Sequence, residues 1–137
     1  MSNLEIYPVL LEELSSIKNE ILPILIKCYE HNADVYDVTP DQLIDLALDR
    51  EYLIWIGKNN NIIEMICVTQ LQKNSFFILI WATKSGWDFN LWYEPTLSKL
   101  ESFAKSLGYS KLEALTRKGL ARKLKWDHEY CIITKNL

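Results

Sequence analysis

Residues 52–83 read YLIWIGKNNNIIEMICVTQLQKNSFFILIWAT. Three runs in this stretch, residues 52–57, 62–72 and 75–83, are rich in Ile, Val, Phe, Trp and Tyr, which strands favour. The breaks between the runs consist of Lys and Asn and are only four and two residues long. Breaks this short join neighbouring antiparallel strands. The stretch therefore predicts a three-stranded antiparallel meander.

The chain before the meander predicts a short strand at residues 5–7 and two helices. Apolar side chains recur at spacings of three and four between residues 14 and 28, as on one face of a helix. Pro23 lies within this segment and predicts a bend or the start of a second segment, because proline removes an amide donor. Thr39, Pro40 and Gln42 supply the cap, the first position and the third position of the second helix.

The chain after the meander predicts a helical crossover into a further strand. The expected elements are a loop at residues 84–90, a helix that faces the sheet through residues 97, 100, 103, 104 and 107 and ends at Gly108, a strand at 109–115, a short helix at 117–125 and a strand at 129–134. Because a helix joins them, the strands at 75–83 and 109–115 are expected to lie parallel to each other.

Length and composition indicate one globular domain over residues 1–137, with 49% hydrophobic and 24% charged residues. The apolar runs are far shorter than the roughly 18 residues of a membrane span, and the N-terminus shows no secretory signal. Cys28, Cys67 and Cys131 are odd in number and have apolar neighbours, which predicts buried thiols in the cytosol. Two His and three scattered Cys lack the short paired spacings of a metal site.

Several segments carry a resemblance to a known family. They are LIWIG at residues 53–57, IIE at 62–64, VT at 68–69, LESFAKSLGY at 100–109 and RKGLARKLK at 117–125. In their order and spacing, over about residues 10–136, they resemble the GNAT superfamily of N-acetyltransferases, and within it the small GNAT-like proteins of tailed bacteriophages. The resemblance implies a GNAT-like α/β fold, in which helices flank a mixed and mostly antiparallel sheet.

The segment after the third strand of the meander departs from the family pattern. Members of the superfamily generally carry Arg/Gln-x-x-Gly-x-Gly/Ala there, and its backbone amides hold the pyrophosphate of acetyl-CoA. Residues 84–92 read KSGWDFNLW, with bulky Trp87, Phe89 and Trp92, one glycine, and Asp88, whose charge would repel a pyrophosphate. The family also commonly has a Tyr acid on the helix after the next strand, and residues 117–125 contain none. The resemblance thus implies a degenerate acyl-CoA site, for which no cofactor is expected.

Three functions follow from these observations. The first is a phage-type GNAT-like protein, in the host cytoplasm or the virion, that acts through contacts with virion or assembly proteins or with its own copies, and not with a membrane. The alternative is an acetyl-CoA-dependent N-acetyltransferase. The second alternative is a weak nucleic-acid-binding protein.

Each candidate site residue has a functional and a structural interpretation. Lys84, Ser85 and Gly86 are the remaining candidates for phosphate contacts, or they form a solvated turn. Glu64 is a candidate proton acceptor, or it lies on the polar face of an alternating strand. His31 and His128 are more typical of exposed turns than of a catalytic pair.

Aromatic residues gather around the loop that follows residue 83. Trp87, Phe89 and Trp92 either anchor another protein chain or pack the crossover helix. The sequence leaves both interpretations open.

Charge is unevenly distributed along the chain. The net charge is −3, but residues 1–64 carry 12 acidic and 4 basic side chains, whereas residues 65–137 carry 6 acidic and 11 basic ones. The basic side chains are densest in one run that consists of Arg117, Lys118, Arg122, Lys123 and Lys125. On a helix these side chains either contact phosphates or form a solvated face.

A salt titration tests the nucleic-acid hypothesis. We expect weak binding of duplex DNA at low salt that vanishes near physiological ionic strength, because the acidic first half opposes it. Phosphate contacts would give a log-log slope of about −0.9 per phosphate neutralised. Binding that persists at physiological salt, and that is lost when the five basic residues become Ser, would contradict this expectation.

Overall fold

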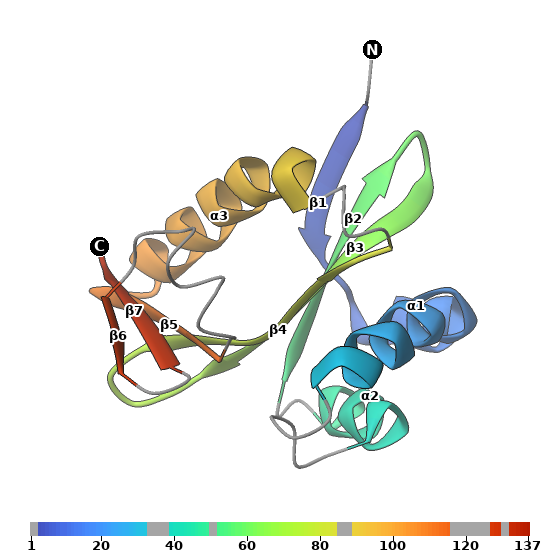
Figure 1. The fold of residues 1–137 in the computed structure, drawn as a ribbon, viewed down its shortest axis with the longest axis horizontal. Helices are drawn as coiled ribbons and strands as arrows, with labels where there is room; N and C mark the ends of the chain where they lie inside the picture. Colours follow the sequence, from blue (N-terminus) through green and yellow to red (C-terminus); the bar gives the residue numbers. More distant parts are fainter. Residues whose placement is uncertain (1–2, 33–38, 50–51, 85–88, 116–126, 130–131) are drawn as a thin grey trace.

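The computed structural model describes residues 3–32, 39–49, 52–84, 89–115, 127–129 and 132–137 (Figure 1). The elements are β1 (Leu4–Pro8), α1 (Leu11–Asn32), α2 (Pro40–Leu48), β2 (Leu53–Asn59), β3 (Ile62–Leu71), β4 (Phe76–Thr83), α3 (Phe89–Ser106), β5 (Lys111–Leu115), β6 (Asp127–Glu129) and β7 (Ile132–Asn136). No helix in these ranges is long and apolar enough to cross a membrane.

The described strands form one sheet in the order β1-β2-β3-β4-β5-β7-β6. Neighbours are antiparallel except β4 and β5, which are parallel, as the helical crossover predicts. Helices α1 and α2 cover one face of the sheet, and α3 crosses the other (Figure 1). The strands β2, β3 and β4 form the expected meander, so this prediction is confirmed.

The central strands separate two hydrophobic cores. Ile56, Val68 and Ile80 belong to the core beneath α1 and α2, here called the α1/α2 core. Met65 and Cys67 belong to the α3 core on the opposite face. Alternate side chains of a strand point to opposite faces, so a meander buried on both faces is apolar almost throughout.

The start of α2 confirms the capping box. The Gln42 amide donates to Thr39 Oγ1 at 3.2 Å, and the Thr39 amide donates to Gln42 Oε1 at 2.9 Å. Two backbone donors that the helix itself leaves unpaired are thereby satisfied. The pair fixes where the chain turns from the loop into α2.

The helix α1 runs through Pro23 as one element, so no second segment begins there, and the expected bend at Pro23 stays a prediction. Pro23 is exposed, and its neighbours Ile21, Ile24 and Leu25 are buried in the α1/α2 core. Burial on both sides of the proline holds the helix together although Pro23 donates no hydrogen bond.

Three boundaries after β4 differ from the prediction. Helix α3 begins at Phe89, inside the expected loop, because Trp92 and Thr96 are already buried. Leu107 is 49% exposed instead of facing the sheet, since α3 ends at Ser106 and Gly108, at φ +88°, turns the chain away. The strand expected at residues 129–134 is instead the antiparallel pair β6 and β7. The prediction missed this break because the sequence between the two strands contains no Gly, Pro or Asn.

Gly57 and Trp92 form a close contact between the sheet and α3. A Cβ atom at Gly57 would lie 2.6 Å from Cζ3 of Trp92 and 3.0 Å from the Met65 side chain. Trp92 is 0% exposed, so its ring cannot move aside into solvent. The absent side chain at Gly57 therefore allows α3 to approach β2 and β3.

The substitution Gly57→Ala tests this contact. We expect it to lower the free energy of unfolding by about 1 to 3 kcal/mol, because the core is overpacked. Trp92→Leu in the same chain should recover part of that loss, which a double-mutant cycle in denaturant unfolding measures. Strictly additive losses would show that the two residues do not press on each other.

Candidate active site

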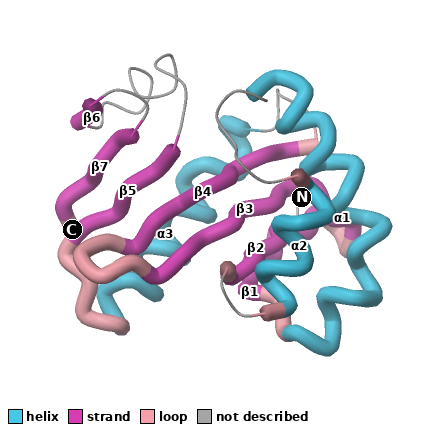
Figure 2. The backbone as a smooth tube through the Cα atoms, turned by 90° about the horizontal axis from the view of Figure 1, so that it is seen from below, coloured by secondary structure: helices cyan, strands magenta, loops and turns pink. Residues whose placement is uncertain are grey.

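Strands β4 and β5 meet at one end and diverge at the other. Their ladder pairs only Phe76–Ile78 with Leu112–Ala114. On its other side, β4 stays paired with β3 as far as Thr83. The tube drawing shows the two strands moving apart beyond the paired end (Figure 2). We call Leu79–Thr83 the diverging segment.

A β-bulge marks the point of divergence. Val68 lies opposite Ile80 and Thr69 opposite Ile78, so Leu79 is an extra residue in β4. It directly follows Ile78, the last residue paired with β5. A bulge bends its strand and increases the local twist. The bulge therefore turns β4 away from β5 while the ladder with β3 continues.

Apolar side chains flank the diverging segment on both faces of the sheet. Ile80 and Ala82 are buried in the α1/α2 core, and Leu79 packs against the same core. On the opposite face Trp81 packs against the α3 core, with its ring 5.8 Å from that of Tyr93 on α3. A molecule that lies along the diverging segment would thus be surrounded mainly by apolar side chains.

Two lysines lie where β4 ends. The Lys84 amide donates to the Glu64 carbonyl at 2.7 Å and extends the ladder by one bond. The Lys84 carbonyl accepts a hydrogen bond from Lys27 Nζ on α1 at 3.0 Å. Both side chains are exposed. Helix α3 begins at Phe89 with no acidic residue in its first turn.

Glu64 occupies a second bulge, on β3. Gly57 lies opposite Met65 and Lys58 opposite Ile63, so Glu64 has no partner on β2. Its side chain is half-buried, and within the described ranges its carboxylate forms no ion pair. The hydrogen bond to Lys84 places Glu64 at the far end of the diverging segment from Leu79.

The other predicted site residues divide into three groups. Trp92 is fully buried in the α3 core, so for this residue the structure shows the packing interpretation and not an exposed anchor. Phe89, His31 and His128 lie on α3, α1 and β6, but their side chains are not described. The predicted residues outside the described ranges are Ser85, Gly86, Trp87, Arg117, Lys118, Arg122, Lys123 and Lys125, together with the short helix expected at 117–125.

Neither the two described thiols nor the described potential metal ligands form a further candidate site. Burial raises the pKa of the Cys67 thiol far above its ordinary value, so this residue stays protonated. Cys28 lies half-buried on α1, and Cys131 lies outside the described residues. Among the described residues, no three of His, Cys, Asp and Glu lie close enough to hold a metal ion.

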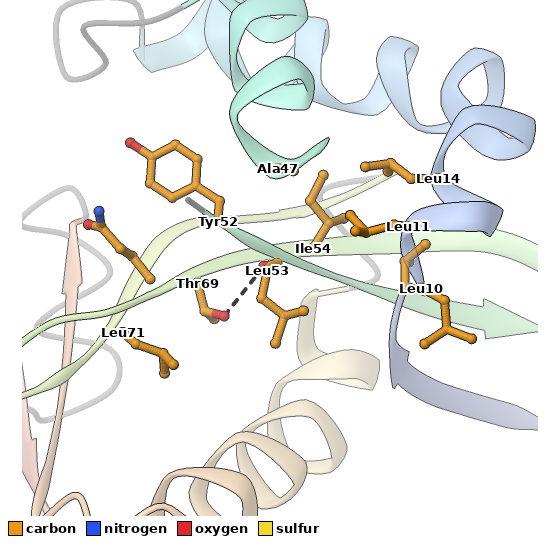
Figure 3. A pocket seen from close by; sticks show the side chains of 11 residues that line it. Leu10, Leu11, Leu14, Ala47, Tyr52, Leu53, Ile54, Thr69 and Leu71 are labelled. Atoms are coloured by element: carbon orange, nitrogen blue, oxygen red, sulfur yellow. Dashed lines mark hydrogen bonds between the residues drawn. The ribbon is translucent and has the colours of Figure 1, made fainter. Parts of the chain in front are cut away.

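A pocket of about 510 Å³ lies beside the first residues of β2 (Figure 3). Tyr52, Ile54 and Ala47 lie on one side of the strands, and Leu53 and Leu71 on the other. None of its lining residues carries a charge. The pocket adjoins the part of β3 that pairs with the closed end of β4, so it is separate from the diverging segment.

Lys27 is a site residue that the sequence did not indicate. It lies on the polar side of an amphipathic helix, 57 residues before Lys84. No local pattern distinguishes it from the other exposed lysines. Only the packing of α1 across the sheet brings its ammonium group to the end of β4.

No protein-family model and no curated protein matches the sequence. Solved structures do match the fold. The PaiA N-acetyltransferase of Thermoplasma acidophilum, in complex with coenzyme A, aligns over 98% of this chain and 99% of its own, with 14% identity and a TM-score of 0.66.

Two further structures agree. An aminoglycoside 6'-acetyltransferase type Ii aligns over 96% of both chains, with 11% identity and a TM-score of 0.74. A GNAT family acetyltransferase of Brucella melitensis, in complex with acetyl-CoA, covers 98% of this chain and 88% of its own, with 10% identity and a TM-score of 0.65. With its parallel pair β4 and β5 inside an otherwise antiparallel sheet, the chain has the fold of the GNAT acetyltransferases.

Proposed function

We propose that the protein is an acetyl-CoA-dependent N-acetyltransferase, the enzymatic alternative that the sequence leaves open. The observation that carries the proposal is the divergence of β4 from β5 at the Leu79 bulge. Solved structures that share this fold over nearly the whole chain hold coenzyme A or acetyl-CoA. Their names concern those proteins, so the residues of this chain have to support the same chemistry.

The length of the diverging segment fits the pantetheine arm of the cofactor. Leu79 and Lys84 are separated by five residue steps, about 17 Å of strand. The arm has about thirteen bonds between its sulfur and its first phosphorus, which at three bonds per residue is about 15 Å of extended chain. An arm that starts near the bulge therefore brings its phosphates to the end of β4. Its two amide groups can form hydrogen bonds with peptide groups on the β5-facing side of the strand.

The apolar side chains around the diverging segment provide a suitable environment for a thioester. Trp81 on one face and Ile80 and Ala82 on the other exclude water from the strand that the arm would follow. Exclusion of water strengthens polar interactions with the reacting groups and slows hydrolysis of the thioester. Acetyl-CoA supplies an activated acetyl group, whose carbonyl carbon bonds to an amine nitrogen while the carbon–sulfur bond breaks and the proton lost by the amine is balanced by one gained by sulfur.

Binding of the cofactor phosphates at the end of β4 would depend more on positive charge here than in proteins with the family's glycine-rich signature. Residues 84–92 contain one glycine in place of the glycine-rich signature, so fewer close backbone contacts are expected. Lys84 is exposed directly beyond the diverging segment. The sequence before α3 also contains Asp88, whose negative charge opposes phosphate binding, so the lysine charge has to outweigh it. A lysine ammonium binds phosphate as a point charge, which compensates in part for missing backbone donors.

If the pantetheine arm follows β4 in this way, Glu64 lies near the cofactor phosphates and not near the thioester. Its backbone is bonded to Lys84, five residue steps or about 17 Å of strand from Leu79. A general base has to lie within hydrogen-bond reach of the proton that it removes, directly or through one water. We therefore favour a structural role for Glu64 over a role in proton transfer.

Calorimetric titration with acetyl-CoA tests the proposed function. We expect a dissociation constant in the micromolar range, about −7 to −8 kcal/mol. The charge reversal Lys84→Glu should weaken binding at least about tenfold. Lys99→Glu, an exposed site on α3, is the matched control and should bind like the parent protein. A parent protein that shows no binding at millimolar acetyl-CoA would contradict the proposal.

The substitution Glu64→Gln tests the position of the proton acceptor. We expect kcat, followed as thiol release with a panel of primary amines, to change less than about threefold, because loss of a general base costs about 100-fold or more. Thermal melting should show that the variant is folded. A 100-fold loss of kcat in a folded variant would assign proton transfer to Glu64.

A further inference from the structure

Lys27 connects helix α1 to the end of β4. Its ammonium group donates to the Lys84 carbonyl at 3.0 Å, across a separation of 57 residues. An ammonium group has three N–H donors, and this hydrogen bond uses one of them. The Lys27 side chain is exposed, so the remaining donors can reach a ligand beyond the end of the strand.

A second lysine, Lys84, lies beside Lys27. The Lys84 side chain projects from the residue whose carbonyl Lys27 binds, and it too is exposed. The ion pairs within the described ranges are Lys18 with Asp41, Lys111 with Glu113 and Lys135 with Glu101. Neither Lys27 nor Lys84 takes part in one, although Glu64 lies across the ladder. Two ammonium groups carried by adjoining residues can both attract one anion.

We infer that Lys27 and Lys84 together bind the diphosphate group of the cofactor, with Lys27 contributed by α1. The inference rests on the proposed function. It adds Lys27, which lies on α1 and therefore outside the segment that carries the glycine-rich pattern. Distance favours a phosphate over an anionic acceptor, because Lys84 lies one arm length, about 15 to 17 Å, from the bulge. The hydrogen bond to the Lys84 carbonyl holds the Lys27 ammonium in place before a ligand arrives, which reduces the entropy lost on binding.

The experiment compares two ligands and four variants. The ligands are acetyl-CoA and S-acetylpantetheine, which carries the same arm without phosphates, and binding is followed by tryptophan fluorescence. Lys27→Ala removes the charge and the donor, Lys27→Gln keeps a donor for the Lys84 carbonyl, and Lys27→Arg keeps the charge. Lys18→Ala is the matched control, since Lys18 lies on the same helix but pairs with Asp41.

We expect Lys27→Ala and Lys27→Gln to weaken acetyl-CoA binding about tenfold and to reduce its dependence on salt. Lys27→Arg and Lys18→Ala should bind acetyl-CoA as the parent protein does. S-acetylpantetheine should bind all variants equally, because it offers no phosphate.

Four results would overturn the inference. Unchanged acetyl-CoA binding in Lys27→Ala would remove Lys27 from the phosphate site. Equal losses for both ligands would assign Lys27 a structural role in holding the end of β4. Unchanged acetyl-CoA binding combined with a selective loss of activity toward carboxylate-bearing amines would assign its charge to the acceptor. A parent protein that binds neither ligand would overturn the proposed function together with the inference.

Discussion

The change of partner along β4 is the constraint on which the site depends. For three residues β4 is paired on both sides, and after the bulge at Leu79 it continues with β3 alone. A strand can leave one neighbour only if its other edge and both faces stay anchored. Here the β3 ladder anchors the edge, and the α1/α2 core and the α3 core anchor the faces. The separation of β4 and β5 is therefore built into the packing of the whole domain.

Much of the fold could be predicted because it depends on local patterns. Three apolar runs with very short breaks predict the meander, and Thr39 with Gln42 predicts the start of α2. The errors arise where tertiary packing prevails over local preference. Burial of Ile21 and Leu25 carries α1 through Pro23, and burial of Trp92 starts α3 inside an expected loop. Bulges are also invisible in the sequence, since Leu79 and Glu64 lie in runs that are regular in composition.

The candidate site was less predictable for the same reason. The sequence indicates Lys84 as a candidate because it lies between a predicted strand and a predicted helix. Lys27 is close to Lys84 only because α1 packs across the sheet, which the sequence does not show. The sequence is compatible with Trp92 either on the surface or in the core. In the structure its ring fills the space beside Gly57, where a Cβ atom would clash with it. The absent glycine signature favoured a protein without a cofactor. The separation of β4 from β5 instead favours a cofactor arm bound along β4, with cations in place of some backbone donors.

Hydrogen–deuterium exchange on the full chain tests the central claim most directly, because it reports the protection of backbone amides. The account predicts that acetyl-CoA slows exchange in the diverging segment, Leu79–Thr83, and that S-acetylpantetheine at saturating concentration slows it in the same segment. Strands β1 and β2, on the far side of β3, should exchange as before. Acetyl-CoA that binds with unchanged exchange in Leu79–Thr83, or with protection only elsewhere, would contradict the account.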